Sequence, residues 1–573
     1  MKILGIHDGH TATVCNLLNG AITHLASEER FTNVKNQGGF PEKACEWAIK
    51  VMANGVDDYD AFAFPGRLIP INDISAYNRD RHKWYKLASR YLPSTLLAND
   101  YLSELYVKRN QIKREALDYY EGNLSRLGIN KSKCHFVEHH ECHAATAYYL
   151  DPKYSPARKV LILTLDGSGD GLSATVSIGF GGKLERIASI PTYHSIGILY
   201  SRMTAFLGMK PLEHEYKLMG MAPYAPDSLT EKSYHVLKKY FSLDESGLYF
   251  VNKSGVWGHE LIRKFQKDLL MHRFDGICGG LQKLTEELCL QWISNWVKHT
   301  GISNIGLAGG VFMNVKLNML INEHPVIDDV FFMPSCGDES IAAGAALMVE
   351  AQNSNYTFTP KPITNLYLGP EYSDNDIEKV LKNVNGISFK HCDKINDEMS
   401  ERLANGNILA RMNGRMEFGA RALGNRSILA NPKHFDIVNK LNKAIKMRDY
   451  WMPFAASILP SGADKYLKSS KAKYAPFMIV CFETTEKASE IRAGLHQGDY
   501  TCRPQIVDPN ENPSYYDLLL KFESKTGISG LLNTSFNIHG YPMVNNPDQA
   551  LWTLTNSGLD GLQMGNFFVT RTS

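Results

Sequence analysis

The 573-residue chain lacks an excess of charge of either sign. It has 62 basic and 60 acidic side chains, which give a formal net charge of +2. Binding to nucleic acid or to an anionic membrane through bulk charge is therefore not expected. The chain also lacks an apolar run of about 18 residues, the length that a membrane span requires. Its first residues have neither the apolar core nor the cleavage site of a secretion signal.

Paired cysteines and the common nucleotide motifs are also missing. The ten cysteines stand singly, with no CxxC pair, which is typical of reduced thiols in the cytoplasm. No segment fits the Walker pattern GxxxxGK[ST] or the dinucleotide pattern GxGxxG, so ordinary P-loop and Rossmann folds are disfavoured. The composition and length predict a soluble cytoplasmic protein of two or three domains.

A strand–turn–strand plan occurs twice along the chain. "KILGIHDG" opens the first unit, in which an Asn-Gly turn joins the second strand to the third. The second unit begins with an apolar strand at Val160–Leu165, followed by the glycine turn "DGSGDG" (166–171). The repetition predicts a duplicated architecture. Coincidence between two hairpins is the alternative.

Helical spacing and composition divide the rest of the chain. Helices are predicted over 77–127, Leu281–His299 and Ala342–Ala351. The polar stretch 351–376 contains three prolines and no periodicity, which is typical of a linker. We therefore place a domain boundary near 355–365, between domains at 1–355 and 365–573.

The stretch "VEHHECHAATAYYL" (137–150) contains a candidate metal site. His139 and His143 are four residues apart, so on a helix they lie on one face and can share a metal ion. In a chain with 19 histidines such a pair can arise by chance, so buried structural histidines remain the alternative. The alanines that follow predict a slim helix that other elements can approach closely. A third ligand is needed from elsewhere, preferably a carboxylate for Fe(II) or Mn(II).

Glycine-rich turns form a second group of candidates. "DGSGDG" (166–171) and "LAGGVFMN" (307–314) each follow an apolar strand, and "SCGDESIAAGAAL" (335–347) places Asp338 at the mouth of a helix. Such turns offer backbone N–H groups to a phosphate. One glycine turn alone has no such meaning, but three in one domain favour a nucleotide-binding α/β fold.

Basic residues gather in the C-terminal part among apolar residues. Guanidinium groups suit bidentate recognition of phosphate or carboxylate. Because these residues alternate with apolar ones, a phosphate pocket is favoured over a solvated basic face. "LLNTSFNIHGYP" (531–542) offers hydroxyl and amide groups nearby. The residues are Arg411, Arg415, Arg421, Arg426, Lys446, Arg448 and Arg503.

Taken in order, the motifs resemble the NodU/CmcH family of O-carbamoyltransferases along nearly the whole chain. The resemblance is carried by "GIHDGHTATV", "EERFTNVK", "HHECHAATAYY", "TLDGSGDG", "EYKLMGMAPY", "GGVFMN", "CGDESIAAGAAL", "EFGARALGNRSILA", "KMRDYWMPFAAS", "TCRPQIV" and "NTSFNIHG". It implies an α/β protein: a duplicated actin-like, sugar-kinase-type ATPase fold followed by a YrdC-like α/β domain. The first domain would be related to the universal tRNA threonylcarbamoyl-transfer protein.

The resemblance also implies a two-stage reaction. The YrdC-like domain would form carbamoyl-adenylate and pyrophosphate from carbamoyl phosphate and ATP, with Mg²⁺ accompanying the ATP. The N-terminal domain would then pass the carbamoyl group to a hydroxyl of a small molecule or sugar, releasing AMP. No nucleic-acid or membrane partner is implied, and the oligomeric state, including a homodimer, is left open.

Site residues follow from the same resemblance. His139, His143 and Asp338 would hold Fe(II) or another divalent metal, with Asp166 close by, and Asp8 and His10 would orient or deprotonate the acceptor hydroxyl. The nucleotide would be lined by Lys35, Gly167, Ser168, Gly169, Asp170, Gly171, Lys217, Gly309, Gly310 and Asn314. Carbamoyl phosphate and the ATP phosphates would be bound by Arg415, Arg421, Lys446, Arg448, Arg503 and Ser535.

The chain departs from the family pattern at two positions. Thr11 stands where the family has an acid, and Met452 where it usually has an arginine. Residues 77–127 match no family motif, and acceptor specificity is expected there. A tRNA threonylcarbamoyladenosine enzyme and a non-catalytic nucleotide-binding scaffold are the alternative functions. The near-neutral charge argues against the first. The retained histidines, Asp338 and arginines argue against the second.

Overall fold

The computed structural model of the chain divides into two compact units. The first consists of residues 1–25 and 38–363, and the second of residues 26–37 and 364–573. A short segment of the N-terminal part therefore belongs to the second unit, which the sequence did not predict. The structure describes residues 1–70, 111–113 and 118–572.

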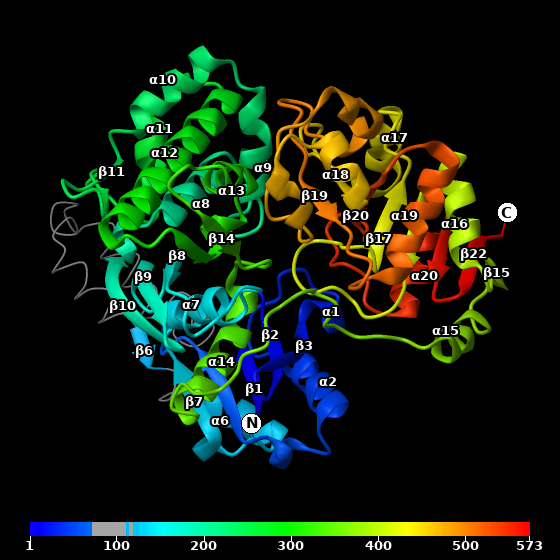
Figure 1. Cartoon of the computed structure of the whole chain (residues 1–573), viewed down its shortest axis with the longest axis horizontal. Helices are drawn as coiled ribbons and strands as arrows, with labels where there is room; N and C mark the ends of the chain where they lie inside the picture. The colour runs from blue at the N-terminus through cyan, green and yellow to red at the C-terminus, as the bar shows by residue number, and fades with distance from the viewer. Residues whose placement is uncertain (71–110, 114–117, 573) are drawn as a thin grey trace. The chain divides into compact units, whose positions relative to one another are not determined.

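Two five-stranded sheets with the same strand order form the centre of the first unit (Figure 1). In each, three antiparallel strands are followed by two parallel ones. This repeated order confirms the predicted duplicated actin-like fold. The first sheet has the order β3 (Ala21–Ser27), β2 (Thr13–Leu18), β1 (Lys2–His7), β4 (Ala61–Pro65) and β7 (Cys134–Val137). The second has the order β10 (Lys183–Pro191), β9 (Leu172–Phe180), β8 (Val160–Gly169), β13 (Asn304–Ala308) and β14 (Asp329–Phe332).

Of the turns in the two strand–turn–strand repeats, one agrees with the prediction and one differs from it. Asn19 and Gly20 both have positive φ, as the expected Asn-Gly hairpin turn requires. Strand β8 does not stop at Leu165 but continues to Gly169, with a register shift against β9 after Leu165. Asp166 therefore lies within the strand, and the turn itself is confined to Asp170 and Gly171.

Two helices of small residues lie between the sheets. Helix α7 (His139–Tyr149) packs on β8 and β13, α14 (Ile341–Asn353) packs on β1 and β4, and the two helices contact each other. A Cβ at Gly344 of α14 would overlap the carbonyl oxygen of Cys142 in α7. The small side chains are thus needed because the two backbones touch. The expectation of a slim, closely approached helix is confirmed.

Further helices and two hairpins complete the first unit. The helix predicted at 281–299 is confirmed within α12, and α14 confirms the one at 342–351. Residues 118–127 are helical as predicted, but Gln111–Lys113 form a strand, so the helical prediction was wrong there; 77–110 and 114–117 lie outside the described residues. The elements are α2 (Glu42–Met52), α6 (Asp118–Leu127), α8 (Ile196–Phe206), α9 (Glu215–Met221), α10 (Asp227–Leu237), α11 (Glu260–Asp268), α12 (Phe274–Thr300) and α13 (Val315–Asn322), with the hairpins β5 (Leu68–Pro70)–β6 (Gln111–Lys113) and β11 (Phe241–Leu243)–β12 (Phe250–Asn252).

The second unit is built on one mixed eight-stranded sheet, which agrees with the predicted α/β class. The core is formed by apolar residues of β16, β17, β20 and β21 with those of the helices on the sheet. The strand order is β15 (Ile387–His391), β22 (Phe567–Arg571), β21 (Gly561–Met564), β16 (Leu409–Met412), β17 (Arg426–Ala430), β20 (Gly530–Ser535), β18 (Ala455–Ile458) and β19 (Pro504–Ile506). The helices are α1 (Glu29–Thr32), α15 (Asp374–Leu381), α16 (Ile395–Ala404), α17 (Asp436–Leu441), α18 (Pro460–Tyr466), α19 (Pro513–Thr526) and α20 (Pro547–Thr555).

The chain between the units is irregular. Helix α14 ends at Asn353 and α15 begins at Asp374, and the boundary between the units falls between Ile363 and Thr364. All ten cysteines are free thiols. None of the helices that the structure describes combines the length and the apolar character that crossing a bilayer requires.

Candidate functional site

Helix α7 presents the two candidate histidine ligands. The helix begins at His139 because Glu138 is extended and its carboxylate accepts the N–H of Glu141, a favourable N-cap. Arg186 forms an ion pair with Glu138 and fixes this cap. From this start, His139 and His143 lie on the same face of α7, and both are buried.

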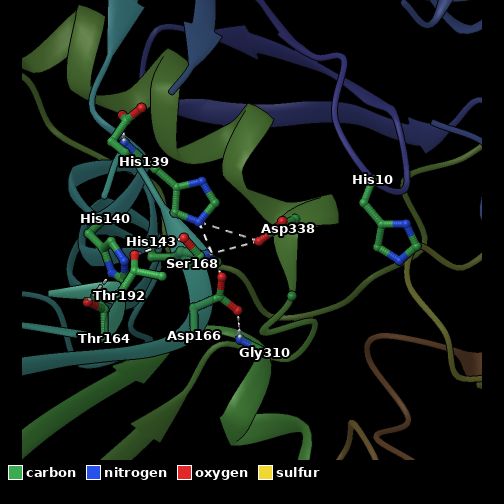
Figure 2. Close-up of polar contacts among 12 residues, drawn as sticks. His10, His139, His140, His143, Thr164, Asp166, Ser168, Thr192, Gly310 and Asp338 are labelled. Atoms are coloured by element: carbon green, nitrogen blue, oxygen red, sulfur yellow. Dashed lines mark hydrogen bonds and ion pairs between the residues drawn. The ribbon is translucent and has the colours of Figure 1, made fainter. Parts of the chain in front are cut away.

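Four donor atoms from three parts of the first unit converge at this face (Figure 2). Nε2 of His139 lies 3.5 Å from Oδ2 of Asp166 and 3.5 Å from Oδ1 of Asp338. Nε2 of His143 lies 3.4 Å from the same Asp338 oxygen. One donor atom from each residue lies within 4.8 Å of all the others. We call these four residues the four-donor cluster.

The four-donor cluster fits a bound metal ion. With metal–ligand bonds of about 2.0–2.2 Å, neighbouring ligand atoms are roughly 3–3.5 Å apart, close to the spacings here. Nε2 of His139, Nε2 of His143 and Oδ1 of Asp338 are buried and have no hydrogen-bond partner among the described residues. Buried polar atoms are normally satisfied, so these atoms point to a missing partner. The donor set of two imidazoles and two carboxylates suits Fe(II) or Mn(II).

Two carboxylates from different elements complete the cluster. Asp166 lies in β8, and its Oδ1 accepts the N–H of Gly310 at 2.9 Å. Asp338 begins the short helical turn before α14 and is the most exposed of the four, with 26% of its side chain accessible. The cluster is therefore open on the side of Asp338.

Electrostatics within the cluster favour ionised carboxylates. Burial lowers the pKa of His139, but Asp338 and Asp166 outweigh it and raise this pKa to about 9. Burial raises the pKa of Asp166, yet the neighbouring imidazoles of His139 and His143 outweigh burial and hold this pKa below its usual range. Burial and Asp166 raise the pKa of Asp338, but His139 and His143 outweigh them, so this pKa lies below its usual value. The site therefore concentrates negative charge that a cation can balance.

His140 is separate from the cluster, as its position on the helix predicts. Its Nδ1 lies 2.8 Å from the hydroxyl of Thr164, which in turn bonds the hydroxyl of Thr175. Burial lowers the pKa of His140 to about 4, so the ring is neutral near pH 7. His140 serves the packing of α7 on β8 and β9.

The two predicted acid–base residues lie apart from the cluster. Asp8 is buried at the end of β1, and the structure places His10 on the far side of Asp338 from His139, with no contact to the cluster (Figure 2). Nε2 of His10 lies 3.1 Å from the carbonyl oxygen of Leu212. A carbonyl oxygen only accepts, so Nε2 carries the proton and Nδ1 keeps its lone pair. In the neutral ring, Nδ1 is then the nitrogen that can accept a proton.

The predicted nucleotide loops have their polar groups largely engaged. The N–H of Gly309 donates to the carbonyl of Cys336, and that of Gly310 donates to Asp166. The hydroxyl of Ser168 bonds that of Thr192, and the carbonyl of Gly171 accepts the N–H of Thr192. A phosphate that contacts the amides of Gly309 and Gly310 would have to displace these two bonds.

The other residues predicted to contact the nucleotide lie in several different elements. The carbonyl of the Asn314 side chain caps α13, and its amide donates to Gln282. Lys217 lies on α9, half-buried. Lys35 belongs to segment 26–37 of the second unit, and its charge contributes to lowering the pKa of Lys446. Gly167 has open space around its Cα.

Lys446 is the centre of a cationic site in the second unit. Its ammonium is buried and donates to neutral oxygens only: the carbonyl and hydroxyl of Ser535 and the carbonyl and side-chain oxygen of Asn537. Burial, then Arg448 and Lys35, lower its pKa well below the usual range. No carboxylate pairs with Lys446 in the part of the chain that the structure describes. The site therefore favours an anion. We call Lys35, Lys446, Arg448 and Ser535 the cationic site.

Two of the arginines expected in a phosphate pocket are structural, which corrects the prediction. Arg411 and Arg426 are fully buried. Arg426 donates to the main-chain carbonyls of Pro370, Asn413, Gly414 and Asn425. Arg411 donates to the hydroxyl of Ser514 and to the carbonyl of Gly424. Their guanidinium groups are used to hold loops together.

The remaining basic residues differ in their surroundings. Arg415 donates to the carbonyls of Leu368 and Gly369 and so fixes the start of the second unit. Arg421 and Arg503 are partly exposed, and burial lowers the pKa of Arg503. Met452 is buried.

Sequence reasoning missed two residues of the second unit. Asn537 contacts Lys446 twice, and it lies in the quoted segment 531–542, where its polar type was the available signal. Glu417 is buried, and one of its oxygens accepts the N–H groups of Leu423, Asn425 and Arg426. It shapes the arginine-rich loop from within, which its place between apolar residues could have indicated.

Comparison with known proteins gives a consistent result along the chain. Residues 2–347 match the family described as Carbamoyltransferase N-terminus, and residues 400–571 match Carbamoyltransferase C-terminus. An uncharacterized protein of Methanocaldococcus jannaschii is 30% identical, covering 99% of both chains. Nodulation protein NolO of Bradyrhizobium diazoefficiens is 31% identical over 76% of this chain and 79% of its own length. The 3'-hydroxymethylcephem-O-carbamoyltransferase of Amycolatopsis lactamdurans is 28% identical over 47% of this chain and 49% of its own.

Proposed function

The chain belongs to the carbamoyltransferase family, and on that premise we propose that it is an ATP-dependent O-carbamoyltransferase acting on a hydroxyl of a small molecule or sugar. The observation that supports two coupled reactions is the presence of one candidate site in each unit. The first unit has the four-donor cluster, which suits a metal ion. The second has the cationic site around Lys446, which suits an anion. The four-donor cluster and the cationic site share no residue.

In the first proposed reaction, the second unit forms carbamoyl-adenylate. For the atoms to balance, carbamoyl phosphate loses its phosphate to water, and the carbamate oxygen attacks the α-phosphorus of ATP with loss of pyrophosphate. Lys446, Arg448 and Lys35 would bind the phosphate groups, together with the Mg²⁺ that accompanies ATP. The hydroxyl of Ser535 would contribute a further hydrogen bond.

In the second proposed reaction, the first unit transfers the carbamoyl group. The hydroxyl oxygen of the acceptor attacks the carbamoyl carbon, and AMP leaves with the bridging oxygen. Held by His139, His143, Asp166 and Asp338, a divalent metal would neutralise the adenylate phosphate and stabilise charge on departing AMP. His10 would take the proton of the acceptor hydroxyl at Nδ1, because its Nε2 is committed to the carbonyl of Leu212.

The proposed acceptor class rests on a relative. The matched relative from Amycolatopsis lactamdurans is named for carbamoyl transfer to a 3'-hydroxymethylcephem. An acceptor hydroxyl on a small molecule or sugar is the corresponding proposal here. The near-neutral charge of the chain is consistent with a small acceptor and not with tRNA.

Pyrophosphate release from ATP tests the proposal. The purified full-length chain should release pyrophosphate only when carbamoyl phosphate is added, and a hydroxylated acceptor from a small-molecule panel should gain the mass of a carbamoyl group. Release that depends on threonine and bicarbonate instead would replace the proposal with a threonylcarbamoyl activity. No release under either condition would leave a nucleotide-binding scaffold.

A further inference from the structure

Asp170 lies directly beside the four-donor cluster without belonging to it. It follows the last residue of β8, the strand that carries Asp166, and it forms the turn to β9 with a φ of +49°. Aspartate is among the few non-glycine residues that tolerate this conformation. The turn places its carboxylate between the N-terminus of α7 and the end of β4.

Three backbone amides from two distant segments donate to this carboxylate. Oδ2 accepts the N–H of His139 at 2.9 Å and that of Arg67 at 2.9 Å. Oδ1 accepts the N–H of Leu68 at 2.7 Å. Both oxygens are therefore committed within the protein. A residue held in this way is a structural anchor, and it is not placed to contact a nucleotide.

The bond to His139 has a specific effect on α7. The first amides of a helix have no partner within the helix, and a carboxylate at this end also interacts favourably with the helix dipole. Asp170 satisfies the amide of the first residue of α7, which is itself a candidate ligand. Because the carboxylate is held by Arg67 and Leu68 as well, it ties His139 to the base of the β5–β6 hairpin.

The residue before Asp170 constrains the side chain of His139. A Cβ at Gly169 would overlap the imidazole ring of His139. Only a residue without a side chain leaves room for the ring in its present place. Asp170 thus fixes the main chain of His139, and Gly169 leaves the space that its ring occupies.

We propose that Gly169 and Asp170 are positioning residues that set His139 for metal binding in the four-donor cluster. This assignment rests on the proposed metal site. It gives the glycine turn at 166–171 a role other than phosphate binding. Asp166 supplies a ligand, Gly169 leaves room for the ring of His139, and Asp170 anchors the main chain of His139. Outer residues that orient metal ligands typically change metal affinity by about 10–100-fold.

Co²⁺ titration of the full-length chain tests the assignment, with the visible absorption of bound Co²⁺ as the readout. Asp170→Ala should weaken Co²⁺ binding by about 10–100-fold and shift the absorption bands. Asp170→Asn should have a smaller effect, because its amide keeps one accepting oxygen. Gly169→Ala should also weaken binding, through displacement of the ring. Asp244→Ala is the matched control, since Asp244 accepts the amides of Leu248 and Tyr249 in the turn between β11 and β12.

Hydrogen exchange separates positioning from general destabilisation. In Asp170→Ala, amide exchange should rise in the peptide covering 137–142, with carbamoyl-phosphate-dependent pyrophosphate release unchanged. Equal Co²⁺ affinity in wild type, Asp170→Ala and Gly169→Ala would overturn the assignment alone. A wild-type chain that takes up no Co²⁺ would overturn the metal site and this assignment together.

Discussion

The main-chain N–H of Gly310 donates to Oδ1 of Asp166 at 2.9 Å, and the other oxygen of that carboxylate lies 3.5 Å from Nε2 of His139. One carboxylate is thus divided between two tasks. Oδ1 holds the turn after β13 to β8, and Oδ2 faces the four-donor cluster. Replacing Asp166 with asparagine can separate the two tasks. An amide oxygen can accept the N–H of Gly310, but the NH₂ group beside it cannot bind a cation.

Asp166→Asn is expected to keep the fold and lose the metal. The asparagine oxygen can accept the amide of Gly310, but its NH₂ group then faces the cluster and cannot ligate a cation. Metal affinity should fall by more than about 100-fold, beyond the usual effect of an outer residue. Metal titration together with thermal unfolding checks this. Unchanged affinity would show that Asp166 is not a ligand.

His139→Ala is expected to separate the two proposed reactions. Transfer to the acceptor should be lost with the metal, but pyrophosphate release should remain because Lys446 and its neighbours lie in the second unit. Both rates can be measured on the same preparation. His135→Ala, an exposed histidine in β7, is the control and should change neither rate. If both reactions fail in a folded His139→Ala variant, the two-site proposal is wrong.

Anion binding in the second unit is expected to depend on pH through Lys446. Burial, Arg448 and Lys35 hold its pKa well below the usual range, so it loses its proton at a lower pH than an exposed lysine. The charged form attracts the anion, so affinity for pyrophosphate should decrease as the pH rises through this depressed pKa. Calorimetric titration across pH 6–10 measures the effect, roughly spanning the range in which lysine pKa values are found.

The matched variants for this pH dependence lie on one helical turn. Lys446→Met should bind pyrophosphate weakly at every pH and lack the dependence. Lys443→Met, at an exposed position, should behave as the wild type does. A wild-type affinity that rises with pH would contradict the assignment of Lys446.

Replacing two arginines of the second unit with leucine is expected to affect different properties: stability for one and anion affinity for the other. Arg426→Leu removes the donor to the carbonyls of Asn413 and Gly414, at about 1–3 kcal/mol for each group left unpaired, while the carbonyl of Pro370 keeps the N–H of Met416. The free energy of unfolding should fall by at least about 2 kcal/mol, as measured with urea. Arg448→Leu should change stability little and reduce anion affinity instead. Equal loss of stability in both variants would argue against this division.

Local signals in the sequence predict only the two histidines of the four-donor cluster. The spacing of His139 and His143 fixes their common face on a helix, whereas Asp166 and Asp338 were assigned to the site from the family resemblance. The duplicated sheets were predictable for a similar reason, since hairpin turns such as Asn19–Gly20 are encoded in two residues.

Residues whose role depends on distant partners were not predictable. Arg411 and Arg426 have the same local pattern as a phosphate-binding arginine, and only the loops around them show that they are fully buried. Asp170 reads as part of a glycine turn, but its partners Arg67 and His139 lie 103 and 31 residues away. Lys35 follows a motif of the N-terminal part, and no local pattern reveals that it belongs to the other unit.

The path of the chain through segment 26–37 has a consequence for how the two units are connected. Arg30 in this segment donates a buried hydrogen bond to the carbonyl of Gly419, 389 residues later. The early segment thus leaves the ribosome long before its partner is synthesised, so the second unit can be completed only at the end of translation. A protease cut between Ile363 and Thr364 would leave two fragments that still co-elute in gel filtration, because the N-terminal fragment carries a built-in piece of the other unit.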